Sequence, residues 1–317
     1  YLNMYARVQV GEVVFFFFYS ITITESVKEI SDTAVVELPR NYKKLNGKPL
    51  LSYVYPGAYV RIETGYNGDF QTDFAGYVKA GISADYPIVI ECDKLYYLRQ
   101  NNHVLSYEDV SLKELLYKIA PCYKIECPDV QLGKLAIDNA SSVKMFNWLR
   151  DKWGLFIRVV DESIYAGWPF DFKPGFTKTH EYILGSNTKS MANLKFETEP
   201  DYNLQVNVNI HQKDGTIKRV KANELKDDQA KVIRLDAYNI SEVAAKQMAL
   251  AHQKQISYNG YSGMIKGFGF PRVHAGDNVT IIDPFALDRK GTYVTEKMVL
   301  EFAEAHIERS SYLSFKA

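Results

Sequence analysis

The chain has 317 residues, of which 46% are hydrophobic and 24% are charged, a composition typical of a soluble globular protein with room for two or three domains. Lysine plus arginine and aspartate plus glutamate number 38 each, so the basic excess of a nucleic-acid-binding protein is missing. The apolar run Val13 to Tyr19 falls far short of the roughly 20 residues that a membrane-spanning helix needs. We therefore expect neither nucleic-acid recognition nor membrane insertion by this chain.

Residues 1–98 have an all-β pattern, with turn signals between short segments rich in β-branched and aromatic residues. Asn67-Gly68 is a strong hairpin signal, because both residues tolerate the positive φ of a tight turn. Short strands at this spacing, without helices, predict a first small β-barrel domain over residues 1–98. The predicted strands are Ala6–Val10, Val13–Thr24, Ser31–Leu38, Tyr59–Thr64, Phe70–Ala80 and Pro87–Cys92.

Four consecutive phenylalanines, Phe15 to Phe18, lie inside the second of these predicted strands. A strand that is apolar on both faces should be covered on both sides. One cover is the core of the domain, and the other is either the same domain or a neighbouring subunit. Since successive strand residues point in opposite directions, we expect Phe16→Asp or Phe17→Asp to disrupt folding or assembly.

Residues 99–168 change character and predict a small α/β domain. Ser111-Leu112-Lys113-Glu114 has the pattern of a capping box, and Pro121 ends the helix that follows. A second helix is predicted from Ser142, with Gly154 at its C-terminal cap. The apolar stripes are Leu112, Leu115, Leu116 and Ile119 in the first helix and Val143, Phe146, Leu149 and Trp153 in the second. The strands predicted to follow are Leu155–Val160 and Ser163–Ala166.

Residues 169–317 return to β and predict a second β-barrel domain that contains one helix at about 241–258. Leu204–Ile210 alternates between apolar and polar residues, and Asp214-Gly215 is a hairpin turn leading into Ile217–Val220. The helix is expected to follow Ser241 and to end before Gly260. The remaining predicted strands are Ser262–Phe268, Asn278–Ile282, Thr292–Phe302 and His306–Ser314.

Two segments of the chain resemble each other. Tyr55-Pro56-Gly57-Ala58-Tyr59-Val60-Arg61-Ile62 and His274-Ala275-Gly276-Asp277-Asn278-Val279-Thr280-Ile281 both place a glycine shortly before an alternating strand. Each is followed by another turn and a second strand, containing Gly76-Tyr77-Val78 in one case and Thr292-Tyr293-Val294 in the other. The pattern indicates either two related barrels on both sides of the α/β domain or a chance similarity between hairpins.

The search for chemistry predicts no catalytic, cofactor-binding or metal-binding residues. No nucleophile elbow, zinc-protease motif or phosphate-binding loop occurs, and Gly267-Phe268-Gly269 lacks a third glycine. Asp227-Asp228 and Asp161-Glu162 could serve a glycosidase, which needs two carboxylates about 5 to 10 Å apart, but solvated turns explain them better. Asp69 and Asp73 lack the calcium-loop pattern. The histidines, scattered without ligand spacing, are His103, His180, His211, His252, His274 and His306.

The three cysteines, Cys92, Cys122 and Cys127, are an odd number, which argues against a disulfide framework. No histidine or further cysteine stands at zinc-ligand spacing from them. We expect three reduced, mostly buried thiols in a protein that folds in a reducing cytosol.

Several segments, in order, resemble the baseplate hub family of contractile tails. That family includes the late control protein D type, the Mu-like 43 kDa tail protein and the N-terminal hub of the type VI secretion spike protein. The resembling segments are Ile30–Pro39, Tyr55–Val60, Phe74–Val78, Phe146–Leu149 with Trp153–Leu155, Gly276–Val279 and Gly291–Val294. Their order and spacing cover most of the chain, although no single motif is diagnostic.

The resemblance implies a non-enzymatic α+β protein, mainly β, with two small barrels joined to a small α/β domain. It further implies a homotrimer whose six similar barrels form a ring between the tail tube protein and the central spike protein, in contact with other baseplate proteins. Such a protein would be assembled in the bacterial cytoplasm and reside in a virion tail or an injection-machine baseplate. Two alternatives remain open: a carbohydrate- or receptor-binding tail module, in which tyrosines grip the ligand, and a peptidoglycan hydrolase.

Overall fold

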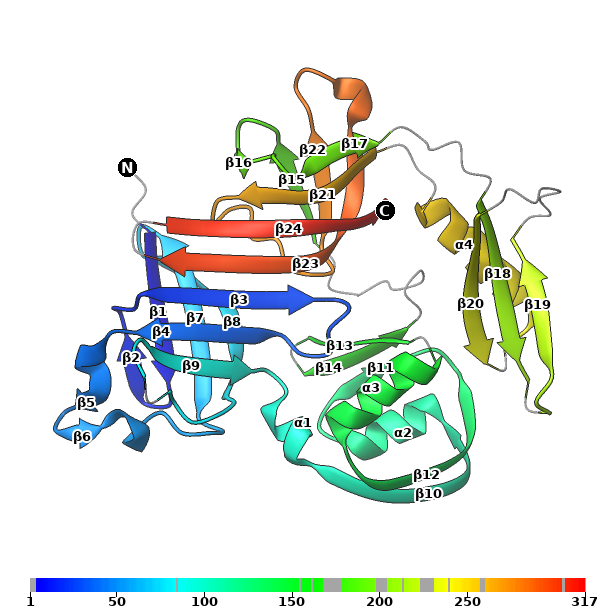
Figure 1. The fold of residues 1–317 in the computed structure, drawn as a ribbon, viewed down its shortest axis with the longest axis horizontal. Coiled ribbons are helices and arrows are strands. Elements are labelled where there is room, and N and C mark those ends of the chain that lie inside the picture. Colours follow the sequence, from blue (N-terminus) through cyan, green and yellow to red (C-terminus); the bar gives the residue numbers. More distant parts are fainter. Residues whose placement is uncertain are drawn as a thin grey trace.

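The computed structural model describes residues 4–83, 85–153, 155–160, 162–167, 178–197, 204–212, 214–222, 231–238, 240–256, 260–303 and 306–316. Strands predominate over helices in these ranges (Figure 1), which confirms the predicted α+β, mainly β class. Most of the strands belong to one 14-stranded sheet that contains two similarly ordered groups.

The first group, module 1, is formed by six strands from the N-terminal part of the chain. They are β1 (Met4–Val10), β3 (Ser20–Ser26), β4 (Thr33–Leu38), β7 (Tyr59–Tyr66), β8 (Asp69–Val78) and β9 (Ile88–Asp93). Neighbours pair antiparallel in the order β1-β7-β8-β9-β4-β3. Alternate residues such as Val8, Val36 and Val60 are fully buried, so one face of the sheet closes over a common apolar core.

The Asn67-Gly68 turn joins β7 to β8, as its sequence predicts. Both residues have positive φ, 53° and 88°, which matches the right-handed twist of the two strands. The short strand β2 (Val13–Phe15) extends module 1 beyond β1. A small hairpin of β5 (Lys44–Leu45) and β6 (Lys48–Pro49) lies between the 3-10 turns η1 (Arg40–Lys43) and η2 (Leu50–Ser52).

The second group, module 2, is formed by strands from the C-terminal half. They are β15 (Thr179–Ile183), β16 (Thr188–Ser190), β17 (Leu194–Glu197), β21 (Gly260–Gly267), β22 (Asn278–Ile282), β23 (Gly291–Ala303) and β24 (His306–Lys316). Their order is β15-β22-β23-β24-β21-β16, and β17 continues the edge strand along β21. The turn η3 (Leu287–Arg289) lies between β22 and β23. A separate apolar core, including Tyr182, Ile265 and Tyr293, supports this module.

The two modules share one topology. We number the strands of each module from one to six along the chain, with β16 and β17 counted as one edge strand. In both modules the strands then lie side by side in the order first, fourth, fifth, sixth, third, second. They differ in that the first strand pairs antiparallel with the fourth in module 1 and parallel in module 2. The pairing path through the described residues stays open at both ends, so we call them sheet modules and not closed barrels.

The two similar sequence segments occupy equivalent places in these modules. Gly57 and Gly276 both have positive φ, 87° and 92°, in a tight turn before the fourth strand. Each turn is fixed by the same hydrogen bonds: Gly57 N–H to Val78 O at 2.8 Å and Val78 N–H to Ala58 O at 2.9 Å, and Gly276 N–H to Thr295 O and Thr295 N–H to Asp277 O, both at 2.8 Å. The resemblance between the segments therefore reflects a repeated structure.

One ladder joins the two modules. Beyond Thr295, strand β23 leaves β22 and runs antiparallel to β3, from Lys297 opposite Ser26 to Ala303 opposite Ser20. The strands β21, β24, β23, β3, β4 and β9 therefore form a continuous layer across both modules (Figure 1).

An α/β unit follows module 1. Its elements are α1 (Tyr96–Gln100), β10 (Asn102–Ser111), α2 (Leu112–Ile119), β11 (Lys124–Glu126), β12 (Gln131–Ser141), α3 (Ser142–Trp153), β13 (Phe156–Val160) and β14 (Ser163–Gly167). The Ser111 hydroxyl accepts a hydrogen bond from the Glu114 N–H at 3.2 Å, which confirms the predicted cap of α2. All eight predicted stripe residues of α2 and α3 are buried in the core of this unit. The predicted cap residue Gly154 lies outside the described residues.

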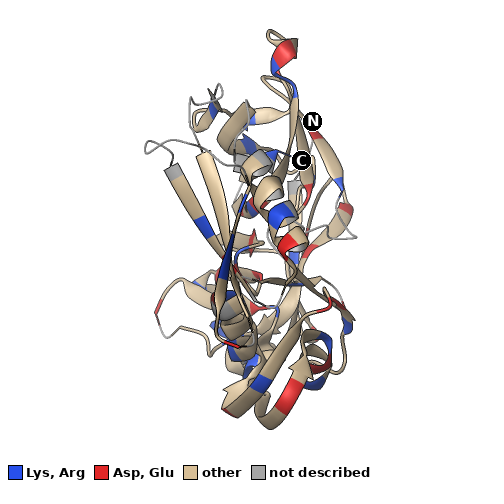
Figure 2. Cartoon of the chain, turned by 90° about the vertical axis from the view of Figure 1, so that its right-hand side faces the viewer, with Lys and Arg blue, Asp and Glu red and all other residues tan. Residues whose placement is uncertain are grey.

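Residues 204–256 form a further unit with a core of its own. Strand β18 (Leu204–His211) lies between β19 (Ile217–Lys221) and β20 (Lys231–Tyr238), and helix α4 (Glu242–Ile256) packs on this sheet. The predicted strand, hairpin and helix are present. However, they form a sheet and a core of their own, apart from the sheet of module 2, in contrast to the predicted second barrel that would include them. Basic and acidic residues are interspersed through the described parts of the chain (Figure 2).

The phenylalanine run differs from the prediction. The predicted strand Val13–Thr24 is interrupted: β2 ends at Phe15 and β3 begins at Ser20. Phe15 is 1% exposed and lies in the core, whereas Phe16 and Phe17 are 60% and 75% exposed. Neither Phe16 nor Phe17 therefore faces the domain core, because both lie between the two strands and belong to no ladder, where strand alternation does not apply. The other expectation, that one of them faces a joint with a neighbouring subunit, stays a prediction.

Candidate assembly interface

The joint between the modules contains a buried cluster of charges. Asp73 of β8 is paired with Arg309 of β24 at 2.6 Å and with Arg272, just before the module 2 turn, at 2.8 Å. The Asp73 and Arg309 side chains are fully buried and Arg272 keeps 10% of its surface. Arg309 also donates to the Val273 carbonyl at 2.8 Å, and the Thr64 hydroxyl donates to Asp73. Buried charges need partners, so the cluster holds module 2 in one position on module 1.

A second ion pair lies on the same face of the layer as Arg309. Glu25 of β3 is buried and accepts hydrogen bonds from the Ala275 N–H at 3.0 Å and from the His274 ring at 2.9 Å. Burial by itself raises the pKa of Glu25, but His274 and, more weakly, Arg158 outweigh it and lower that pKa to about 2. Burial opposes protonation of His274, yet Glu25 holds the pKa of the imidazole above its usual value. The carboxylate and the imidazolium therefore stabilise each other across the joint.

The same region attaches the α/β unit. Arg158 of β13 reaches Glu25 at 3.9 Å, and Arg99 of α1 pairs with the buried Asp93 at 2.5 Å. Burial raises the pKa of Asp32, and Lys94 at 3.4 Å partly opposes this shift. Glu25 thus lies where module 1, module 2 and the α/β unit meet. The sequence offered no signal for this, because an isolated glutamate near the end of a strand usually faces solvent.

The layer that spans both modules has a polar face opposite its core. Residues directly opposite each other in a ladder share a face, so the pairings define this surface. Its hydroxyl and carboxylate groups come from Ser20, Thr22, Thr24, Thr33, Glu37, Glu91, Glu301, Glu308 and Ser310. Glu308 is held by Lys266 at 2.5 Å and by Lys189 at 3.2 Å. The face carries both signs of charge beside three valines, Val35, Val89 and Val299, and Glu308 and Ser310 are buried within it.

Exposed aromatic side chains lie at three other places. Phe16, Phe17 and Tyr19 project from the link between β2 and β3, and Phe285 is 98% exposed in the loop after β22. Tyrosines form a cluster beside the module 1 turn: the ring centroids are 5.9 Å apart between Tyr59 and Tyr77 and 4.7 Å apart between Tyr77 and Tyr97. Aromatic residues are enriched in protein interfaces, so these surfaces are candidates for contact with partners.

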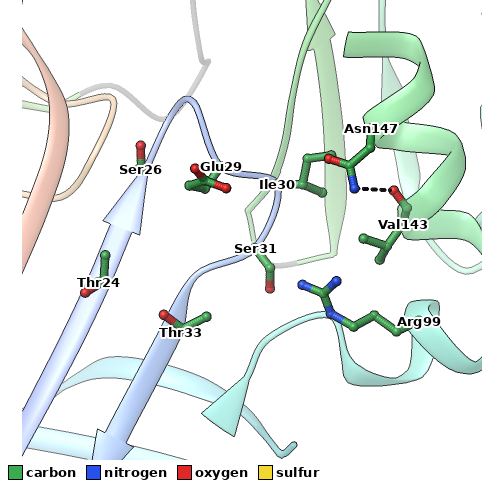
Figure 3. A pocket seen from close by; sticks show the side chains of 9 residues that line it. All are labelled: Thr24, Ser26, Glu29, Ile30, Ser31, Thr33, Arg99, Val143 and Asn147. Carbon is green, nitrogen blue, oxygen red and sulfur yellow. Dashed lines mark hydrogen bonds between the residues drawn. The ribbon is translucent and has the colours of Figure 1, made fainter. Parts of the chain in front are cut away.

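A cavity of about 340 Å³ lies between the β3–β4 end of module 1 and helices α1 and α3 (Figure 3). The lining residues are Thr24, Ser26, Glu29, Ile30, Ser31, Thr33, Arg99, Val143 and Asn147. Arg99 is engaged by Asp93, and the Asn147 amide donates to the Val143 carbonyl at 3.1 Å. The lining brings one carboxylate and one guanidinium near several hydroxyls. The Ser31 hydroxyl donates to Asp93 at 2.6 Å, but that carboxylate also accepts from the Leu95 N–H and from Arg99 and is paired with the arginine.

The residues considered for chemistry are dispersed. In the described part of the chain, no three histidine, cysteine, aspartate or glutamate residues form a group that could hold a metal ion. Asp69 begins β8 at the surface, and Asp73 is the buried partner of two arginines. Asp161 and the pair Asp227-Asp228 lie outside the described residues. His180 and His274 both contact Asp277, through the His180 ring at 3.0 Å and the His274 N–H at 2.9 Å.

The three cysteines are free thiols, as predicted, but they differ in exposure. Cys92 is buried, and burial raises the pKa of its thiol to about 12. Cys127 is half-buried and Cys122 is exposed, which corrects the expectation that the thiols are mostly buried. Within the described residues, no helix is long and apolar enough to cross a membrane.

The fold matches those of solved tail proteins. The prophage MuSo2 43 kDa tail protein from Shewanella oneidensis is 13% identical, with 98% of each chain covered and a TM-score of 0.62. A tail protein from Neisseria meningitidis is also 13% identical, with 99% of this chain and 97% of that chain covered and a TM-score of 0.61.

A third match is the c3393 protein of E. coli, a component of the type VI secretion system that is described as structurally similar to the T4 tail proteins gp27 and gp5. It is 9% identical, with 99% of this chain and 77% of that chain covered and a TM-score of 0.56. No family model and no curated protein matches the sequence. The chain therefore has the fold of phage tail and type VI secretion proteins, and the predicted resemblance to that group is confirmed in the fold.

Proposed function

We propose that this chain is a structural subunit of a tail hub, in which three copies form a ring of six similar modules. The ring joins the tail tube to the central spike of a phage tail or a phage-like injection machine. In this proposal residues 1–98 and 169–317 supply the two ring-forming parts, and residues 99–168 form an appended α/β domain. The protein acts without catalysis, in contact with tube, spike and other baseplate proteins, after assembly in the bacterial cytoplasm.

The observation that supports this proposal most strongly is the repeated strand order of the two modules, joined edge to edge by β23 and β3. A subunit with two equivalent modules can match a sixfold partner with three copies, because each copy supplies two similar surfaces. Its fold likeness to tail and type VI secretion proteins agrees with such a position.

The proposal is tested by native mass spectrometry and negative-stain electron microscopy of the purified chain. We expect a species of three times the 36.2 kDa chain mass and particles with a threefold ring and a central hole. A chain that remains monomeric at high concentration and shows no ring would contradict the proposal.

The tyrosine cluster around Tyr59, Tyr77 and Tyr97 favours one other function, a carbohydrate-binding tail module. Exposed aromatic rings can stack on the apolar faces of sugars, and Tyr59 and Tyr97 are 43% and 51% exposed. Binding of cell-surface glycans by a monomeric chain, abolished by Tyr59→Ala with Tyr97→Ala, would favour this second function over the hub.

A further inference from the structure

The joint between the modules uses two surfaces that each module should possess. One is the outer edge of the second strand, supplied by β3 of module 1. The other is the chain that continues past the fifth strand, supplied by β23 beyond Thr295 in module 2. Because the modules share one topology, a second pair of such surfaces remains. This pair consists of the outer edge of β16 and β17 in module 2 and the segment Lys79–Ser83 that follows β8 in module 1.

Both remaining surfaces are unpaired in the described part of the chain. The strands β16 and β17 bond only to β21, and Lys79–Ser83 belongs to no ladder. The segment nevertheless covers the edge of β9, through the Lys79 N–H to Glu91 O at 2.8 Å and the Val89 N–H to the Ser83 hydroxyl at 3.1 Å. The extension of β23 covers β24 in the equivalent way. An unpaired strand edge is a ready site for another chain.

The two surfaces lie at opposite ends of the layer that spans the modules, with β16 above and β9 below the intervening strands in Figure 1. They therefore cannot meet within one copy. Two complementary surfaces on different sides of a molecule produce head-to-tail contacts, which close into a ring when the rotation between copies permits.

We propose that β16 and β17 of one copy dock on the Lys79–Ser83 segment of a second copy of this chain, repeating the β3–β23 joint. This rests on the proposed hub function and adds to it the surfaces through which the copies meet.

The repeat also predicts a register. The Lys79 N–H bond to Glu91 O continues the Val78–Cys92 pair, as Lys297 opposite Tyr312 continues the Thr295–Leu313 pair past a β-bulge. Gly81 therefore takes the position that Val299 has in module 2, and Ile82, which packs against the module 1 core, takes that of the core residue Leu300. Val299 lies opposite Thr24 in the internal joint. In the ladder of the second and third strands, Leu194 of module 2 lies opposite Gly263 as Ile23 of module 1 lies opposite Ala34. Lys195, the residue after Leu194, therefore takes the position of Thr24, the residue after Ile23. Gly81 of one copy therefore lies opposite Lys195 of the next.

Aromatic side chains replace the ion pair in this second joint. By the same equivalence, Tyr55 takes the place of His274 and Phe196 takes the place of Glu25. Tyr55 is 55% exposed, and Phe196 is half-buried with its ring near Tyr261 and Arg289. A contact between Tyr55 and Phe196 of two copies would bury apolar ring surface without burying an unpaired charge. This gives the exposed Tyr55 a partner of matching chemistry.

The register is tested with the double variant Gly81→Cys, Lys195→Cys in a background carrying Cys122→Ser and Cys127→Ser, since a side chain added at the exposed Gly81 meets no other atom. Cys92 stays because it is buried. We expect mild oxidation, or a short bis-maleimide reagent, to produce covalent dimers and trimers on a non-reducing gel. The pair Lys48→Cys, Lys195→Cys serves as the matched control, since Lys48, like Gly81, is exposed on module 1 but lies on the separate β5–β6 hairpin.

The outcomes separate this inference from the proposed function. A native trimer in which the designed pair cross-links no better than the control pair overturns the joint and leaves the ring intact. A monomer overturns both. A second variant, Tyr55→Ser, is expected to weaken association about tenfold with an unchanged circular dichroism spectrum, because an aromatic contact is lost at an exposed position. Unchanged association in Tyr55→Ser counts against the aromatic contact and hence against the proposed docking.

Discussion

Glu25→Gln is the sharpest test of the internal joint. The substitution keeps an oxygen that can accept the Ala275 N–H but removes the negative charge that faces His274 and Arg158. A carboxyl pKa lowered from 4.5 to about 2 corresponds to about 3 kcal/mol of stabilisation of the charged form. Because the His274 side chain keeps 34% of its surface exposed, solvent screens part of the pair and the expected loss is about 2 kcal/mol.

The loss should depend on pH in a defined direction. The lowered pKa of Glu25 gives stability that is present above pH 4.5 and lost as the pH falls towards 2. The raised pKa of His274 gives stability that is present below pH 6.5 and lost as the pH rises through the folded pKa. Other charged groups face this pair. Arg158 favours the Glu25 carboxylate, Arg309 opposes the His274 imidazolium, and Asp277 favours that imidazolium. The wild-type joint should therefore be most stable between about pH 4.5 and 6.5.

The assay is urea unfolding at about pH 5.5 and about pH 9, with amide hydrogen exchange of β3 and β23 as a local readout of the joint. We expect the difference between wild type and Glu25→Gln to be largest at the lower pH and to shrink at the higher pH, as His274 loses its proton. Glu301→Gln, an exposed carboxylate on the same ladder, is the control. Equal stability of Glu25→Gln and wild type at the lower pH, or a difference that does not change with pH, would refute the reasoning.

Three further predictions concern separate parts of the molecule. Asp73→Asn leaves Arg309 and Arg272 without their buried counter-charge and should lower the free energy of unfolding by roughly 3 to 5 kcal/mol, more than Asp69→Asn at the surface, in urea titrations. Ser111→Ala removes the cap of α2 and should cost about 1 kcal/mol; an unchanged unfolding midpoint would show that the hydrogen bond to Glu114 contributes nothing. Phe15→Ala should cost about 3 to 5 kcal/mol, because the ring is buried, whereas Phe17→Ala should leave the stability of the monomer unchanged; equal losses in thermal melts would contradict the exposure of Phe17.

The sequence by itself determined the local features of this protein. Asn67-Gly68 fixes a hairpin because few residues tolerate two consecutive positive φ angles. Ser111 fixes the start of α2 because its hydroxyl satisfies a backbone N–H that the helix leaves unbonded. The alternation around Val60 and Ile62 identified a strand and its buried face. These signals depend only on residues a few positions apart, so they can be recognised before the fold is known.

The tertiary structure alone decided how the modules meet. Asp73 finds Arg272 and Arg309, and Glu25 finds His274, across more than half the chain, and nothing near any of these residues indicates its partner. The run after Phe15 leaves the strand, although its composition favours β structure, because the chain must turn from β2 into β3. Long-range pairing depends on which edges and buried charges the folded modules present to each other. A local pattern can therefore predict the strands but not the joint that unites them.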